Sequence, residues 1–227
     1  MVAISSVRIV PYTRGRERSR RKEDILREVE ELKASGRKEV VLLGQNVNAY
    51  GKDLKMEDGF TQLLVAVAKT GIERISFYTS HPRDYSETTI DAMRDYPNIM
   101  PFLHLPVQSG SDEVLRRMAR GYTAERYKQL YDDLKKKVPH IAFTTDLIVG
   151  FPNETDEEFE ATLDLVRYCR FDMAYAFIYS PRAGTPAANM EDNIPLEVKK
   201  ERLARLNDLL TEIAEENNRR FLGETVS

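Results

Sequence analysis

The stretch IAFTTDLIVGFPNETDEEFEATLDLVRYC, residues 141–169, decides the fold class that this chain is expected to adopt. Residues 141–149 are mostly apolar and β-branched, which is typical of a strand buried on both faces. A Gly-Phe-Pro turn follows, and Thr155 with Glu158 three residues later has the pattern of a capping box at a helix start. The apolar face of that helix consists of Phe159, Leu163 and Val166. The stretch therefore predicts a buried parallel strand, a turn and a helix.

The same strand–helix unit recurs along the chain about every 33 residues, the size expected of a βαβ repeat. Apolar, β-rich runs predict strands at residues 7–11, 39–43, 74–79, 102–107, 141–149 and 173–179. Apolar residues at helical spacing predict helices around Ile25–Leu32, Phe60–Val67, Ile90–Met93 and Tyr127–Leu134. Cap residues agree, because Ser35-Gly36 is suited to end the first helix and Ser86 to start the third.

The number of units predicts an open barrel. Eight units need roughly 250 residues, whereas this chain of 227 residues has room for six and a terminal helix at about 195–220. That helix begins near Pro195, and its apolar stripe consists of Val198, Leu203, Leu206, Leu210 and Ile213. Six parallel strands that curl without closing form a partial (β/α)6 TIM-like barrel. A doubly wound sheet is the structural alternative, because the sequence does not fix strand order.

Composition restricts the class of protein. The chain has 34 basic and 37 acidic residues, which describes a mixed-sign, well-solvated surface. No apolar run approaches the 18 or so residues that a membrane span needs, and residues 1–5 lack the charged region of a signal peptide. The single cysteine, Cys169, excludes a disulfide framework. We expect a cytoplasmic, monomeric, globular protein that does not contact a membrane.

Basic charge is concentrated near the start of the chain. Arg14, Arg16, Arg18 and Arg20, followed by Arg21 and Lys22, fall within nine residues. Such a cluster is usually a solvated loop. It is also the electrostatic signature expected of a surface that binds a phosphate backbone.

Polar side chains at the predicted strand ends indicate a binding site, because ligands of parallel α/β folds bind outside these ends. Gly44, Gln45, Asn46 and Asn48 follow the second strand, and the amides of the last three can donate and accept hydrogen bonds at once. The alternative interpretation of these residues is an Asx-rich loop without a binding function. Six polar strand ends, Ser80–Asp84 after the third strand among them, are expected to converge on one rim.

Two further strand ends have both a structural and a functional interpretation. Gln108 and Ser109 precede a helix whose start Ser111 can cap, so this is either a plain turn or a set of N–H groups that binds a carboxylate or ribose hydroxyl. Gly150 is either a turn glycine or a position that permits flat approach of an adenine ring.

Histidine and cysteine do not predict a metal site. His81, His104 and His140 lie on different predicted strands or loops, without the short ligand spacing of a zinc site. Cys169 is expected to be an inert, partly buried thiol on a helix flank. No nucleophile–base pattern, P-loop or GxGxxG is present, so no catalytic residue is assigned.

Six segments together resemble the radical-SAM tRNA methylthiotransferases, most closely the branch that makes 2-methylthioadenosine. They run in order along almost the entire chain: VPYTRGRERSR at 10–20, LLGQNVNAYG at 42–51, SHPRD at 80–84, LHLPVQSGSD at 103–112, TTDLIVGFP at 144–152 and FIYSPRAGTPAA at 177–188. The resemblance implies a radical-SAM partial barrel that methylthiolates C2 of a modified tRNA adenosine. It leaves open whether that adenosine carries an isopentenyl or a threonylcarbamoyl group.

The resemblance also implies cofactors, partners and site residues. Family members use S-adenosylmethionine and 4Fe–4S clusters and act on the anticodon stem-loop of tRNA. By resemblance, Gly44, Gln45 and Asn46 lie near the amino-acid end of the cofactor. Gln108 and Ser109 lie near its ribose or carboxylate, and Gly150 near its adenine. Arg14, Arg16, Arg18 and Arg20 are expected to face tRNA.

The chain departs from the family pattern at the cluster loop. The three cysteines of the family's CxxxCxxC motif correspond here to Met1, Ser5 and Arg8, so we expect no cluster and no activity. Residues 1–227 are interpreted as the core domain alone, starting within the cluster loop and ending before the family's C-terminal RNA-binding barrel. The alternative function is a non-catalytic scaffold that binds S-adenosylmethionine or RNA.

Overall fold

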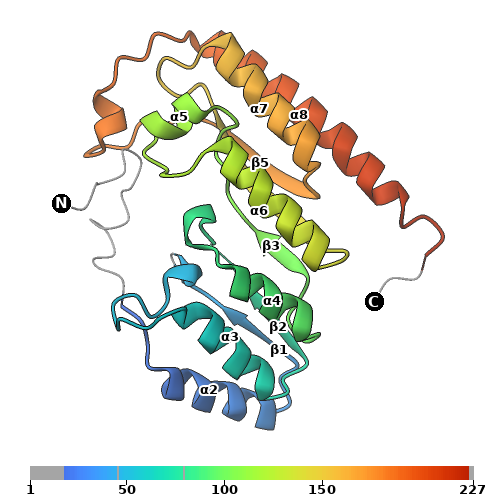
Figure 1. Ribbon diagram of the computed structural model, residues 1–227. Helices are drawn as coiled ribbons and strands as arrows, with labels where there is room; N and C mark the ends of the chain where they lie inside the picture. Colours follow the sequence, from blue (N-terminus) through green and yellow to red (C-terminus); the bar gives the residue numbers. More distant parts are fainter. Residues whose placement is uncertain (1–17, 45, 79, 225–227) are drawn as a thin grey trace. The chain divides into compact units, whose positions relative to one another are not determined.

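A computed structural model describes residues 18–44, 46–78 and 80–224 (Figure 1). The described chain forms two compact units. The amino-terminal unit consists of residues 18–105 and 132–142, and the carboxyl-terminal unit consists of residues 106–131 and 143–224. The predicted first strand at 7–11 lies outside the described residues.

The amino-terminal unit is built on two parallel strands. β1 (Glu39–Leu42) pairs with β2 (Arg74–Phe77) in a register that places Glu39 opposite Arg74 and Leu42 opposite Phe77. The helices are α2 (Lys22–Ala34), α3 (Gly59–Lys69) and α4 (Glu87–Asp95), and α3 packs against both of the others. Phe60 of α3 meets Phe77 edge-to-face at 5.2 Å between ring centroids. The short strand β3 (Phe102–His104) also belongs to this unit.

The carboxyl-terminal unit is built around β4 (Ala142–Val149) and β5 (Met173–Ile178), which pair in parallel from Thr144 opposite Met173 onward. Its helices are α5 (Asp112–Arg117), α7 (Asp156–Cys169) and α8 (Leu196–Arg219). α8 contacts both α7 and β5, and the two helices lie side by side next to this strand (Figure 1). α6 (Ala124–Lys137) begins in this unit and ends with residues of the other.

The local signals read from the sequence are confirmed at these elements. Thr155 Oγ1 accepts from the Glu158 N–H at 3.2 Å, and Glu158 accepts from the Thr155 N–H at 2.9 Å, which completes the predicted capping box. Ser86 and Ser111 cap α4 and α5 through their hydroxyls. The strand pairs β1–β2 and β4–β5 are parallel, as predicted.

The terminal helix buries charged side chains that the apolar stripe did not predict. Leu206 and Ile213 of α8 are buried as expected, but so are Lys199 and Arg202. Arg202 Nη1 donates to both the carboxylate and the carbonyl oxygen of Glu154, each at 2.9 Å, and Glu154 is fully buried. Burial raises the pKa of Glu154, and the Gly150 N–H and Arg202 only partly oppose it.

This ion pair ties α8 to the turn that follows β4. The Glu154 carboxylate accepts the Gly150 N–H at 2.7 Å. Gly150 has a φ of +67°, and a Cβ at that position would lie 2.6 Å from Lys199 Cγ. Glycine is therefore required both by the left-handed backbone and by the aliphatic stem of Lys199. Contacts with α8, which begins 46 residues after Gly150, therefore hold the turn after β4 in place.

Replacing Arg202 by methionine is expected to destabilise the protein by about 3–5 kcal/mol, because Glu154 would remain buried without its partner. Denaturant unfolding measures this. The double variant E154Q/R202M should recover much of the loss, since the amide oxygen can still accept the Gly150 N–H.

Arg205 supplies the matched control, because it also pairs from α8 with an acid, Glu160, but both side chains are about half exposed. R205M should lower the free energy of unfolding by less than about 1 kcal/mol. Equal losses for R202M and R205M would contradict the assignment of a buried pair.

Candidate functional site

In the amino-terminal unit, side chains join the segments that follow β1 and β2. Asn46 Nδ2 donates to Asp84 Oδ2 at 2.6 Å. Lys52 Nζ donates to the other oxygen of Asp84 at 2.5 Å, and Arg83 pairs with the same carboxylate at 3.3 Å. The segments that follow the two strands are therefore joined through one carboxylate.

Asp84 is ionised and its charge is balanced. Its side chain is only 4% exposed. Burial alone would raise the pKa of Asp84, but hydrogen bonds from Lys52, Arg83 and Asn46 lower it to about 2. The carboxylate thus carries a full negative charge at neutral pH, held between an ammonium and a guanidinium.

Three side chains in the segments that follow β1 and β2 contain buried polar atoms that have no hydrogen-bond partner among the described residues. They are Asn46 Oδ1, both amide atoms of Asn48, and Ser80 Oγ. Asn48 lies in a short 3-10 turn (Val47–Ala49) after β1, and Ser80 lies three residues beyond the end of β2. Each unsatisfied buried group costs about 1–3 kcal/mol, so such groups are unusual in a folded protein.

In the carboxyl-terminal unit, Gln108 and Ser109 are held by β4 and α7. Gln108 has a φ of +73°, and its backbone exchanges hydrogen bonds of 2.9 Å with Asp146 and Ile148 of β4. Ser109 is completely buried, and its hydroxyl lies 3.1 Å from that of Thr162 on α7. Since this hydroxyl is already engaged within the protein, its contact with a ribose or carboxylate stays a prediction.

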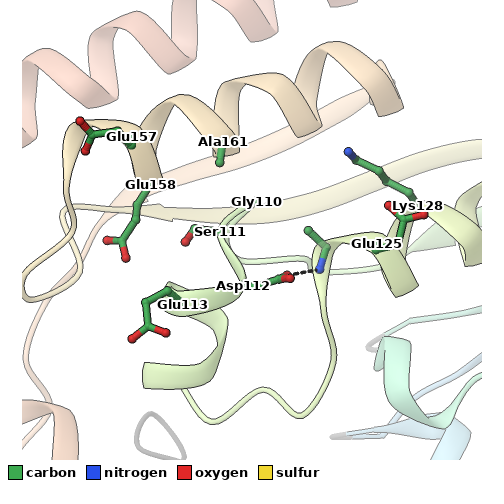
Figure 2. Close-up of a pocket in the computed structure, with 10 residues that line it drawn as sticks. Gly110, Ser111, Asp112, Glu113, Glu125, Lys128, Glu157, Glu158 and Ala161 are labelled. Carbon is green, nitrogen blue, oxygen red and sulfur yellow. Dashed lines mark hydrogen bonds between the residues drawn. The ribbon is translucent and has the colours of Figure 1, made fainter.

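A cavity of about 460 Å³ lies beside this segment, between α5, α6 and α7 (Figure 2). Gly110 lines it, and a Cβ there would lie 2.2 Å from the carbonyl oxygen of Ala161, so glycine permits the close approach to α7. The charged lining residues are Asp112, Glu113, Glu125, Glu157, Glu158 and Lys128. The acids that line it would repel phosphate, so this cavity does not suit an RNA backbone.

The structure places the predicted cofactor residues in both units. Gly44 and Asn46 belong to the amino-terminal unit, and Gln108, Ser109 and Gly150 to the carboxyl-terminal unit. Gln45 lies outside the described residues. Glu154, Arg202 and Lys199, which fix the Gly150 turn, were not found by sequence reasoning. Long charged side chains on a helix give no local signal that they are buried.

The predicted RNA-binding arginines are only partly described. Arg14 and Arg16 lie outside the described residues. Arg18 is exposed, and Arg20 is exposed and pairs with Glu28 at 2.7 Å. The carbonyl oxygen of Arg20 accepts from the Tyr50 hydroxyl at 2.8 Å, which fixes the backbone but leaves the guanidinium at the surface.

Cys169 is packed in the interior of its unit, and His81 caps a short turn. Cys169 is completely buried at the end of α7, whereas only partial burial was predicted. His81 Nδ1 accepts from the Arg83 N–H at 3.3 Å. Within residues 18–44, 46–78 and 80–224, no three His, Cys, Asp or Glu side chains converge as metal ligands would.

Comparison with known proteins gives the family. The Radical SAM superfamily model matches residues 6–166. The chain is 57% identical to a tRNA-2-methylthio-N(6)-dimethylallyladenosine synthase of Geobacillus kaustophilus, over 96% of this chain and 41% of that protein. A protein of the same name from Bacillus cytotoxicus is 56% identical, over 96% of this chain and 43% of that protein. The chain thus spans about two fifths of the length of these relatives.

Solved structures agree on the fold. Coproporphyrinogen III oxidase from Escherichia coli, described as a radical SAM enzyme, superposes with a TM-score of 0.61 at 19% identity, covering 86% of this chain and 47% of that one. A radical S-adenosylmethionine methyltransferase from Kitasatospora setae superposes with a TM-score of 0.59 at 17% identity. The superposition covers 74% of this chain and 33% of that one. The predicted α/β fold class, an open, partial TIM-like barrel of the radical-SAM type, is confirmed. The chain belongs to the radical SAM superfamily.

Proposed function

We propose that this chain is the core domain of a tRNA methylthiotransferase, which adds a methylthio group to C2 of an isopentenylated adenosine next to the anticodon. The observation that carries the proposal is the 57% identity, across 96% of the chain, to a protein named as a synthase of that nucleoside. The domain assignment is residues 1–227, with α8 packed as a terminal helix. Its partners would be the tRNA anticodon stem-loop and S-adenosylmethionine, and we propose a cytoplasmic monomer.

The strand ends would bind S-adenosylmethionine. Gly44, Gln45 and Asn46 are proposed to lie near its amino-acid end, Gln108 and Ser109 near its ribose or carboxylate, and Gly150 near its adenine. This proposal is supported by the position of these residues after β1, after β3 and after β4. It is also supported by the ion pair with Arg202, which holds the Gly150 turn in one conformation.

The residues of this chain do not fit an iron–sulfur cluster. A cluster is held by several thiolates, and the one cysteine in 227 residues is completely buried in a helix. We therefore propose that this chain by itself does not complete the reaction. The second candidate, a non-catalytic scaffold that binds S-adenosylmethionine or RNA, is favoured by the same observation. Among the described helices, none has an apolar stretch that could span a lipid bilayer.

Anaerobic treatment with iron and sulfide is expected to leave no charge-transfer absorption on the desalted protein, because thiolate ligands are lacking. The variant C169S should give the same spectrum as the parent chain. A cluster band that survives desalting would show that the chain finds ligands elsewhere and would restore the enzyme hypothesis for this chain.

S-adenosylmethionine should bind with a Kd no tighter than micromolar in calorimetry, because hydrogen bonds worth about 0.5–1.5 kcal/mol each would have to hold it. Asn46→Ala should weaken this binding further. Asn218→Ala, which removes an exposed amide near the end of α8, should not. Submicromolar binding would show that the protein groups alone are sufficient.

Anticodon stem-loop RNA should bind weakly and with steep salt dependence. Each lost phosphate contact reduces the slope of the logarithm of the binding constant against the logarithm of the salt concentration. The reduction is about 0.9 for duplex or 0.7 for single-stranded nucleic acid. Replacing Arg14, Arg16, Arg18 and Arg20 by serine should abolish binding at low salt and leave the melting temperature nearly unchanged.

The control for this experiment replaces four exposed arginines elsewhere, namely Arg94, Arg116, Arg167 and Arg205. That variant should retain the affinity. The reverse result, retained binding in the first variant and loss in the control, would place the RNA surface on the helices.

A further inference from the structure

One strand of the carboxyl-terminal unit leaves large apolar side chains open on one face. Met173, Tyr175 and Phe177 of β5 are 52%, 53% and 53% exposed. Side chains alternate between the two faces of a strand, so these three lie on the same face. The residues between them are less exposed, and α8 packs beside the strand (Figure 1). Among the described residues, β5 is thus covered on one face and left half open on the other.

The neighbouring strand β4 extends this face. Residues that pair in a parallel ladder project to the same side of the sheet. The printed register of the two strands places Thr144 opposite Met173, Asp146 opposite Tyr175 and Ile148 opposite Phe177. The next residue of β5 on this side, Tyr179, is buried with its ring 5.0 Å from that of Phe151. The open face therefore ends at Phe177, close to the strand ends where parallel sheets bind ligands.

The same unit buries its other strand and helix aromatics. Phe143 of β4 and Phe159 of α7 are almost completely buried, and so is Phe171, which precedes β5. The exposure of Tyr175 and Phe177 is therefore specific to this face. Contiguous exposed apolar side chains of this kind mark an interaction site in a folded protein.

The chemistry of this face favours a neutral, apolar group. Four of its six residues are apolar or aromatic, namely Ile148, Met173, Tyr175 and Phe177. Aromatic rings and the methionine thioether pack well against hydrocarbon. A carboxylate is bound best by a cation, whereas the one charged residue among the six, Asp146, is an acid.

The two candidate target nucleosides differ in this respect. A dimethylallyl (isopentenyl) group on N6 of adenosine is a neutral, branched hydrocarbon, whereas a threonylcarbamoyl group ends in a carboxylate. We propose that Ile148, Tyr175 and Phe177 receive the dimethylallyl group of the target adenosine, and that Asp146 disfavours the threonylcarbamoyl group. This inference rests on the proposed function, which supplies a modified tRNA adenosine as the substrate.

Binding is measured on the 227-residue chain by NMR titration of its methyl groups with three nucleosides: N6-dimethylallyladenosine, adenosine and N6-threonylcarbamoyladenosine. The methyl signals of Ile148 and Met173 should shift with the first. That nucleoside should bind about tenfold more tightly than adenosine, because its hydrocarbon leaves water on binding. N6-threonylcarbamoyladenosine should bind no more tightly than adenosine.

Substitutions on the face test its role. Tyr175→Ser and Phe177→Ser should each reduce the preference for N6-dimethylallyladenosine to less than about threefold. Their melting temperatures should stay nearly unchanged, because both side chains are half exposed. Tyr168→Ser is the matched control, since this ring on α7 is 47% exposed in the same unit, and the variant should keep the preference. Asp146→Asn should strengthen the binding of N6-threonylcarbamoyladenosine alone.

Three results would overturn the inference. They are equal affinities of the parent chain for N6-dimethylallyladenosine and adenosine, a preference that persists in both Tyr175→Ser and Phe177→Ser, and an equal loss of the preference in Tyr168→Ser. The first comparison needs no variant, so it decides the matter even where a variant fails to fold. Unchanged binding of N6-threonylcarbamoyladenosine in Asp146→Asn would refute the part assigned to Asp146.

An anticodon stem-loop with and without the dimethylallyl group separates this inference from the proposed function. If the chain prefers the dimethylallyl nucleoside but binds neither stem-loop, the site stands and the proposed function fails. If both stem-loops bind equally tightly, the proposed function stands and this inference fails.

Discussion

Parallel strand pairing is the constraint on which this structure depends. Parallel strands cannot be joined by a hairpin, so each connection passes through a helix that returns the chain to the starting edge. The pairing of β1 with β2 and of β4 with β5 therefore places the turns after each pair at one edge of its own unit. The side chains at that edge take no part in the hydrogen bonds between the strands.

The fold could be predicted from the sequence because its signals are local. A β-branched run followed by a turn and a capping box, as at residues 141–169, specifies strand, turn and helix without information from elsewhere. The parallel arrangement followed from strands that are apolar on both faces. The left-handed backbone of Gln108 could not be foreseen, because only tertiary contacts hold a non-glycine residue at a φ of +73°.

The sequence could predict where the candidate site lies, but not which of its side chains are hydrogen-bonded within the protein. The sequence indicated that Asn46 and Asn48 were unusual amides at a strand end. Whether each finds a partner depends on Asp84, which lies 38 residues from Asn46 and pairs with it but not with Asn48. The pair of Glu154 and Arg202, separated by 48 residues, was invisible for the same reason. A charged side chain can be buried only where a segment distant in the sequence provides a partner of opposite charge.

The dependence of the Gly150 turn on α8 has a consequence for recombining relatives of this protein. A hybrid gene that joins the strand–helix units of one homologue to the terminal helix of another would separate Glu154 from the arginine selected to neutralise it. Crossovers placed between residues 154 and 202 would succeed only when both parents carry compatible charges at these two positions. The functional border of this domain, for exchange between proteins, therefore lies after α8 rather than after the last strand.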